Sequence, residues 1–266
     1  VTGPPGAGKS TLVDKLTAET RQAGETVGVL AVDPTSPFTG GAILGDRLRM
    51  QTHAQDEHVF IRSMATRGHM GGLSRTTGDA ALVLDAAGKS LVIIETVGVG
   101  QDEVDIVRTA DVSIVVLVPG TGDDVQALKA GIMEIADIYV VNKCDREGAE
   151  RMVTSIESNL ALQSFGDGEW RPPIVKTEAN TGRGVAELWQ TIAAFRTHSE
   201  GARIKRLKAR NEFRLRDLLT HRFMEYVERD VLGTEPFEAL VERIARREVD
   251  PYTAASDILS RALKHS

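Results

Sequence analysis

A glycine-rich run near the start of the chain has the residue types and spacing of a phosphate-binding loop. Residues 3–10 read Gly-Pro-Pro-Gly-Ala-Gly-Lys-Ser, which fits the pattern G-x-x-x-x-G-K-[ST]. Glycines let the backbone curl so that its N–H groups face phosphate oxygens, and a helix predicted from Gly8 adds the positive end of its dipole. Lys9 would bind the β- and γ-phosphates and the Ser10 hydroxyl would bind Mg²⁺. A chance match is expected in on the order of one chain per hundred, but the long helical pattern that follows favours function.

A second motif, Asn142-Lys143-Cys144-Asp145, ends a predicted buried strand and has the N-K-x-D form with which many P-loop GTPases bind guanine. The Asp145 carboxylate can accept hydrogen bonds from guanine N1–H and from the 2-amino group. Adenine lacks both donors, so ATP would leave this carboxylate unpaired and desolvated. Asn142 and Lys143 would brace the loop and cover the ring. The alternative is an ordinary turn after a strand. The segment 177–180 follows the next strand and predicts a further base contact, with Ala179 as its backbone donor.

Three acidic residues lie where Mg²⁺ chemistry is expected. Asp33 and Glu95 end predicted strands, and the carboxyl ends of parallel strands meet at the ligand crevice of an open α/β sheet. Such carboxylates can hold Mg²⁺ directly or through water and can orient an attacking water. Gly98, three residues after Glu95, could sense the γ-phosphate through its N–H. Asp46 taken alone is better explained as a residue of a solvated loop or as a helix cap. The presence of the other two acids in phosphate-side loops favours a metal-binding role.

The order of predicted elements indicates an α/β fold of the P-loop NTPase type. Short, continuous apolar runs are typical of strands buried on both faces of a parallel sheet, and helical patterns between them imply right-handed crossovers with helices on both faces. The predicted strands are 27–33, 58–62, 91–95, 112–118, 138–142 and 173–176, and the predicted helices are 8–23, 74–87, 123–136, 147–162 and 184–195.

Two domains are predicted, since 266 residues at about 150 per domain give roughly 1.8 domains. Residues 1–198 form the P-loop domain, whose first strand is represented only by Val1–Thr2 and is expected to be truncated. Residues 199–266 carry only helical patterns, including a last helix begun by Asp250-Pro251 as N-cap and N1. These helices either pack back on the sheet or form an arm for dimerisation or partner contact.

Composition excludes several classes of protein. The formal charge is −6, which argues against binding to nucleic acid or to anionic membranes. The longest apolar runs, such as 112–118, are far shorter than the roughly 18 residues of a membrane span. The single cysteine, Cys144, excludes an intramolecular disulfide and a Cys-rich metal cluster.

Six segments together resemble the MeaB/ArgK family of P-loop GTPases, which includes the methylmalonic aciduria type A protein. The resemblance runs from Val1 to about residue 200 and more loosely through the helical tail. It implies a chaperone or switch for an adenosylcobalamin-dependent acyl-CoA mutase such as methylmalonyl-CoA mutase, in the bacterial cytoplasm or, in a eukaryote, the mitochondrial matrix. The segments are 3–10, 33–37, 40–47, 67–72, 95–101 and 142–145.

The resemblance also implies roles for individual residues. Lys9, Asp33 and Glu95 would be catalytic, and Ser10, Asp33, Asp46 and Glu95 would surround Mg²⁺. The expected contacts to GTP or GDP are Gly3, Pro5, Gly6, Ala7, Gly8, Lys9, Ser10, Thr11, Gly98, Asn142, Lys143, Asp145 and Ala179. A loop at 119–129 would couple the nucleotide to the mutase through Asp123, Asp124, Gln126 and Lys129, and the C-terminal helices would form the arm of a homodimer. No residue is clearly an arginine finger, so slow intrinsic GTP hydrolysis is expected.

Two other functions are weighed against this one. A metallochaperone GTPase needs a Cys/His ligand cluster, and the six histidines show no paired ligand spacing. An ATP-dependent kinase linked to amino-acid transport conflicts with the guanine-type motif at 142–145.

Overall fold

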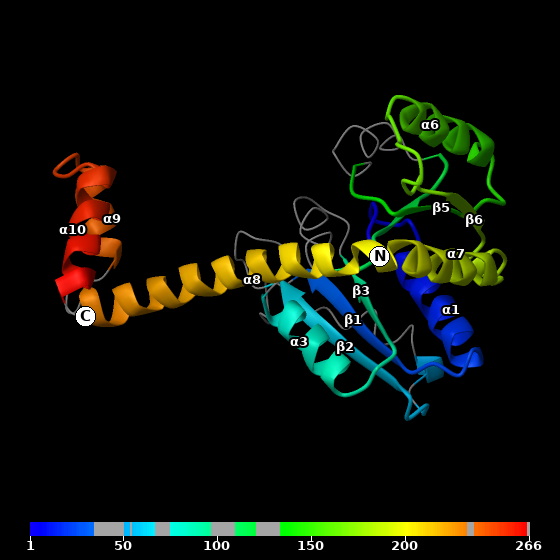
Figure 1. Ribbon diagram of the computed structural model, residues 1–266, viewed down its shortest axis with the longest axis horizontal. Helices are drawn as coiled ribbons and strands as arrows, with labels where there is room; N and C mark the ends of the chain where they lie inside the picture. Colours follow the sequence, from blue (N-terminus) through cyan, green and yellow to red (C-terminus); the bar gives the residue numbers. More distant parts are fainter. Residues whose placement is uncertain are drawn as a thin grey trace. The chain divides into compact units, whose positions relative to one another are not determined.

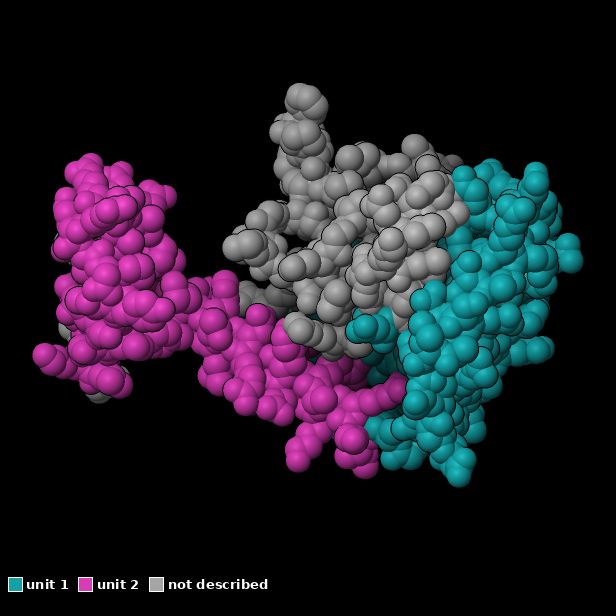
Figure 2. All heavy atoms as spheres, turned by 90° about the horizontal axis from the view of Figure 1, so that it is seen from above, with its two compact units in different colours: residues 1–203 teal, residues 204–266 magenta. Residues whose placement is uncertain are grey.

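The computed structural model of the 266-residue chain is shown in Figure 1. The structure describes residues 1–34, 51–53, 55–66, 75–96, 110–120, 134–232 and 237–264. The chain divides into two compact units, Val1–Arg203 and Ile204–Ser266, which are coloured separately in Figure 2.

In the described part of the first unit, six parallel strands form two three-stranded sheets. One sheet has the order β2-β1-β3 and the other the order β4-β5-β6. The α/β fold with a parallel sheet is therefore confirmed, and the strands lie within a few residues of their predicted positions. Their bounds are β1 Val27–Pro34, β2 Val59–Thr66, β3 Leu91–Glu95, β4 Ile114–Leu117, β5 Ile138–Asn142 and β6 Ile174–Thr177.

Val1 and Thr2 join the two sheets into one. On the β3 side, the Val1 nitrogen donates to Ile94 O at 2.7 Å, and the Thr96 N–H donates to Val1 O at 3.1 Å. On the β4 side, Thr2 exchanges two backbone hydrogen bonds with that strand, at 2.9 and 2.8 Å. Val1 and Thr2 thus act as a short central strand between the two three-stranded sheets, and the phosphate loop starts directly after them.

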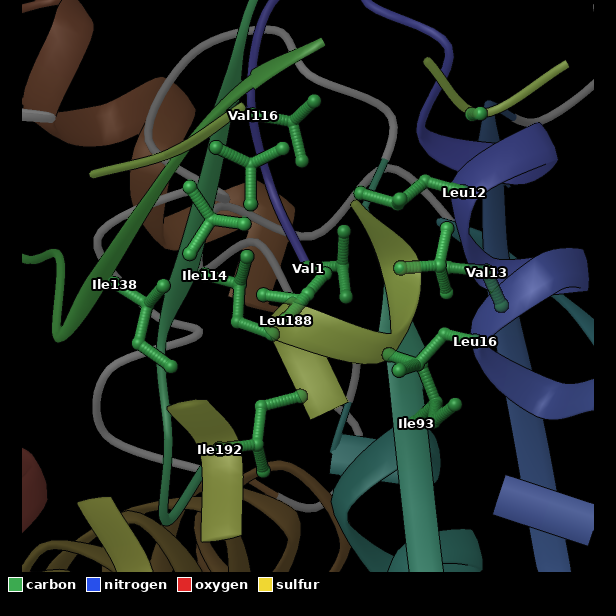
Figure 3. Packing of buried hydrophobic residues seen from close by; sticks show 14 of the residues in the cluster. Val1, Leu12, Val13, Leu16, Ile93, Ile114, Val116, Ile138, Leu188 and Ile192 are labelled. Atoms are coloured by element: carbon green, nitrogen blue, oxygen red, sulfur yellow. The ribbon is translucent and has the colours of Figure 1, made fainter. Parts of the chain in front are cut away.

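Helices cover both faces of the sheets. Alternate strand residues point to opposite faces, so one apolar set packs against α1 (Lys9–Gln22) and α7 (Val185–His198), and the other against α3 (Arg75–Ala86) and α6 (Ala149–Ala161). Figure 3 shows the first set, in which Leu12, Val13 and Leu16 of α1 face Val1 and Ile93. The helix predicted at 123–136 lies largely outside the described residues.

The second unit is helical. Its elements are α8 Arg203–Tyr226, a π-helical turn Val227–Val231, α9 Phe237–Ala245 and α10 Pro251–Lys264. Asp250 caps α10 as predicted, because its Oδ1 accepts the backbone N–H of Thr253 at 3.0 Å. These hydrogen bonds hold the pKa of Asp250 below its ordinary value, the Thr253 hydroxyl contributing most.

Among the described residues of this unit, one apolar cluster contains four buried side chains, Val227, Val231, Leu232 and Ala262, with Tyr226 and Ile258 packed against them. Of the helices that the structure describes, none combines the length and hydropathy that a bilayer span requires.

Candidate functional site

A cavity of about 530 Å³ opens at the carboxyl ends of the strands. Five segments that are far apart in the sequence line it: the phosphate loop with the start of α1, β1, the end of β3, the turn after β5 and the loop after β6. The lining residues are Pro5, Gly6, Gly8, Lys9, Ser10, Thr11, Val32, Glu95, Thr96, Asn142, Lys143, Asp145, Arg146, Glu178, Ala179 and Asn180. Both predicted motifs therefore lie in one cavity, of a size that suits a small-molecule ligand.

The phosphate loop is shaped by two glycines that tolerate no side chain. At Gly3, φ is +139° and an added Cβ would lie 2.0 Å from Val116 O, so the loop starts tightly against β4. At Gly8, φ is +85° and an added Cβ would lie 2.5 Å from Asn142 Nδ2. Helix α1 begins at Lys9, directly after the loop. The first N–H groups of a helix have no intrahelical partner, so this end of α1 is suited to an anion.

Lys9 is turned back onto the loop that carries it. Its Nζ donates to Gly3 O at 2.7 Å and to Pro4 O at 3.1 Å, and the residue is buried. The ammonium group therefore lies within the curl of the phosphate loop, where a phosphate could replace the two carbonyl oxygens as its partner.

Ser10 and Glu95 meet at the phosphate end of the cavity. The Ser10 Oγ donates to Glu95 Oε1 at 2.6 Å, and both residues are buried. A hydroxyl and a carboxylate are the hard oxygen ligands that Mg²⁺ prefers, so the two residues fit a magnesium ion. Asp33 lies in β1 near its carboxyl end, paired in register with Ala65. Two further predicted residues, Asp46 and Gly98, lie outside the described residues.

The side chain of Asn142 ties three parts of the site together. Its Nδ2 donates to Ala7 O of the phosphate loop at 2.8 Å. Its Oδ1 accepts the Thr177 hydroxyl at 3.0 Å and the Ala179 N–H at 3.1 Å. Asn142 is 1% exposed, so both ends of its amide are satisfied away from water. The position of the phosphate loop thus depends on the motif that is predicted to bind the base.

Lys143 makes a second link to the phosphate loop. Its Nζ donates to Gly6 O at 2.7 Å, and its φ of +56° is uncommon for a residue with a side chain. Asp145 is exposed beside it and lines the cavity, free of the core. Behind this end, Lys176 donates to Glu150 Oε1 at 2.9 Å, which raises the pKa of Lys176 and joins β6 to α6.

Several lining or supporting residues were not among those predicted. Thr177 is buried and positions Asn142, Arg146 directly follows Asp145, and Thr96 directly follows Glu95. Each is adjacent to a predicted motif, and that adjacency was the available signal. The predicted donor Ala179 does line the cavity, although its N–H is shared with Asn142 Oδ1.

The predicted coupling loop at 119–129 falls outside the described residues from position 121 onward. Asp123, Asp124, Gln126 and Lys129 lie outside the described residues. Within the part of the chain that the structure does describe, no group of three or more His, Cys, Asp or Glu side chains is placed to hold a metal ion.

Comparison with known proteins identifies the family. The family model described as "Methylmalonyl Co-A mutase-associated GTPase MeaB" matches residues 1–231. The chain belongs to the MeaB family of GTPases. A Pyrococcus abyssi protein named as a GTPase is 52% identical over 269 residues, covering 99% of this chain and 82% of that protein. The mitochondrial methylmalonic aciduria type A homolog of Mus musculus is 32% identical, covering 99% of this chain and 65% of that protein.

Solved structures confirm the P-loop GTPase-like α/β fold. A crystal structure named LAO/AO transport system kinase has a TM-score of 0.67 at 28% identity, covering 98% of this chain and 79% of that one. HypB from Helicobacter pylori, in complex with nickel, has a TM-score of 0.53 at 18% identity, covering 75% and 86% respectively. The second likeness shows the fold alone.

We predict that Gly8→Ala weakens GTP binding by at least about tenfold, because the new methyl group would displace Asn142 from Ala7 O. Gly24→Ala is the matched control, since Gly24 has a similar φ of +82° but open space around an added Cβ. The left-handed backbone should cost each variant about 1–2 kcal/mol of unfolding free energy in urea denaturation, and Gly8→Ala should lose more because it also breaks the buried Asn142–Ala7 hydrogen bond. Calorimetry should show weakened GTP binding for Gly8→Ala alone; equal affinities would contradict the steric argument.

Proposed function

We propose that this MeaB-family protein binds GTP in the cavity and hydrolyses it with Mg²⁺, as a switch on an adenosylcobalamin-dependent acyl-CoA mutase. The observation that carries the nucleotide part is the Asn142 side chain. It holds the N-K-x-D turn against the phosphate loop, so that a single ligand with a base at one end and phosphates at the other would contact both.

Guanine is the base that this end of the cavity favours. The Asp145 carboxylate would accept hydrogen bonds from N1–H and the 2-amino group, and Ala179 N–H would approach the base from the other loop. The side chains of Asn142 and Lys143 are hydrogen-bonded to the phosphate loop. Asp145 is the exposed charged residue of the motif, so its carboxylate is available to a base. ATP would leave that carboxylate without donors.

The phosphate end supports magnesium-dependent hydrolysis. Ser10 and Glu95 would hold Mg²⁺, with Asp33 and Asp46 as further acids, and the ion would neutralise charge on the phosphates. Lys9 would exchange its two carbonyl partners for β- and γ-phosphate oxygens. Glu95 or Asp33 would orient the attacking water, and Gly98 would contact the γ-phosphate. Among the described lining residues the only arginine is Arg146, beside the base motif, so intrinsic turnover is expected to be slow.

The mutase partner is supported by the family match rather than by geometry. The matching family is described as associated with methylmalonyl-CoA mutase, and the mouse relative is named for methylmalonic aciduria. The segment 119–129 would carry the nucleotide state to that partner. Such a protein would work where the mutase does, in a bacterial cytoplasm or a mitochondrial matrix.

A homodimer is the further partner that we propose, formed through the helical unit. Leu215, Leu219 and Phe223 follow one another at four-residue intervals on α8, and their exposed fractions are 58%, 61% and 41%. Residues at this spacing share one face of a helix. None of the three belongs to the described apolar cluster of this unit, so the exposed stripe favours burial by a second copy.

We predict that Asp145→Asn weakens GTP binding about 100-fold, since two hydrogen bonds to a carboxylate are lost. The same variant should gain affinity for XTP, because an amide N–H can donate to the C2 carbonyl that xanthine carries in place of the amine. Asp167→Asn, at an exposed site that does not line the cavity, is the control. Unchanged GTP affinity by calorimetry would remove guanine recognition from Asp145.

We also predict nucleotide-sensitive binding to a purified adenosylcobalamin-dependent methylmalonyl-CoA mutase. Affinity measured by biolayer interferometry should differ by about fivefold or more between GDP and a non-hydrolysable GTP analogue. Absence of binding in both states, with GTP hydrolysis intact, would leave the GTPase and reject the mutase role.

Leu219→Glu should convert a dimer into a monomer in analytical ultracentrifugation, because it places a charge in the apolar stripe. Leu162→Glu is the matched control, since Leu162 is also exposed, at 85%, but lies in the first unit. The dimer proposal is wrong if Leu219→Glu sediments as the wild type does.

A further inference from the structure

Two threonines flank the phosphate end of the site without belonging to either motif. Thr2 directly precedes the phosphate loop, and Thr96 directly follows Glu95. The Thr96 Oγ1 donates to Thr2 Oγ1 at 2.9 Å, and the two residues are 1% and 0% exposed. The bond therefore links, away from water, the residue before the phosphate loop to the residue after the acid.

The threonine pair reinforces the place where the central residues meet β3. The backbone N–H of Thr96 donates to Val1 O at 3.1 Å, so the end of β3 is held by its backbone and by its side chain. Thr96 also lines the cavity, whereas Thr2 is fully covered.

The position of Glu95 matters because its contact with Ser10 is short. Ser10 lies on α1 and Glu95 on β3, and their oxygens are 2.6 Å apart. A shift of the β3 end by a few tenths of an ångström would change this contact. Thr96 is the residue after Glu95, and Thr2 lies on the segment that leads through the phosphate loop into α1. The hydrogen bond between them therefore limits that shift.

Packing alone does not account for the two hydroxyls. Valine has nearly the shape of threonine, so an apolar pair would fill the same space without a buried polar group to satisfy. A buried hydroxyl costs free energy unless it is bonded, and a bonded pair fixes one geometry.

We propose that Thr96 is a positioning residue for GTP hydrolysis. Its hydroxyl bond to Thr2 keeps the Glu95 carboxylate within hydrogen-bonding distance of the Ser10 hydroxyl. The inference rests on the proposed role of Ser10 and Glu95 toward Mg²⁺. It assigns to Thr96 no contact with the reacting atoms.

The test compares wild type, Thr96→Val and Thr96→Ser. Thr96→Val should lower kcat about tenfold with the KM for GTP within about twofold, since base and phosphate contacts remain while the acid is displaced. Mg²⁺ should slow the release of a fluorescent GDP analogue, and this effect does not depend on hydrolysis. For Thr96→Val, the Mg²⁺ concentration that gives half of the maximal slowing should rise about fivefold or more. Thr96→Ser, which keeps the hydroxyl, should restore both values.

Thr20→Val controls for the loss of a buried hydroxyl bond as such. Thr20 is 0% exposed, and its hydroxyl donates to Leu16 O at 2.7 Å, within α1 and away from the cavity lining. It should lower the melting temperature without changing kcat or the Mg²⁺ dependence. If Thr96→Val behaves like Thr20→Val, Thr96 is merely structural and the inference is overturned.

A Thr2→Val variant separates the bond from the individual residue. Thr2→Val, Thr96→Val and the double variant should show the same kcat within about twofold, because each breaks the same bond. Independent, multiplying effects would overturn the inference. If wild-type release of the GDP analogue and wild-type hydrolysis both prove insensitive to Mg²⁺, the proposed magnesium function fails, which is distinguishable from failure of Thr96 alone.

Discussion

The pairing of Val1 and Thr2 between β3 and β4 is the constraint from which the rest of the nucleotide site follows. Four backbone hydrogen bonds place these two residues at the centre of the sheet, and the chain must then leave the sheet at once. It can do so only because Gly3 has no side chain to strike Val116 O. The direction of the phosphate loop, the start of α1 and the meeting of Ser10 with Glu95 all depend on this exit.

The phosphate loop and the N-K-x-D motif are joined by direct hydrogen bonds. Asn142 and Lys143 each donate to a carbonyl of the phosphate loop, and Asn142 also accepts from the loop after β6. Asn142, which belongs to the motif predicted to bind the base, therefore also supports the phosphate loop. Kinetic effects of changes at Asn142 will include loss of phosphate-loop geometry, and they cannot be assigned to the base alone.

Much of the fold was predictable because it depends on local patterns. The continuous apolar runs located β3 and β5 at their observed bounds, since strands buried on both faces need apolar residues throughout. β2 extends four residues beyond its predicted end at Arg62, because an edge strand can carry polar residues that hide the pattern. The π-helical turn at 227–231 has no comparable signature in the sequence.

The candidate site was predictable where spacing along the chain carries the chemistry, as in the phosphate loop and residues 142–145. It was not predictable where the chemistry comes from register between distant strands. The Thr2–Thr96 bond spans 94 residues, and the Thr177–Asn142 bond joins neighbouring strands. The roles of these hydroxyls do not follow from spacing along the chain, because only the strand order brings each one to its partner.

The two ends of the cavity differ in how ready they are for a ligand. At the base end, the amide of Asn142 and the ammonium of Lys143 are already hydrogen-bonded to groups of the protein that a base would not replace under the proposed binding mode. At the other end, the Lys9 ammonium is hydrogen-bonded to two carbonyl oxygens of its own loop. These two bonds must break before the ammonium can bind a phosphate. Association should therefore proceed in two phases, with fast docking of the nucleoside onto a rigid surface and slower capture of the phosphates. An isolated nucleoside would experience only the first phase, and its binding rate would report the preorganisation of the base end alone.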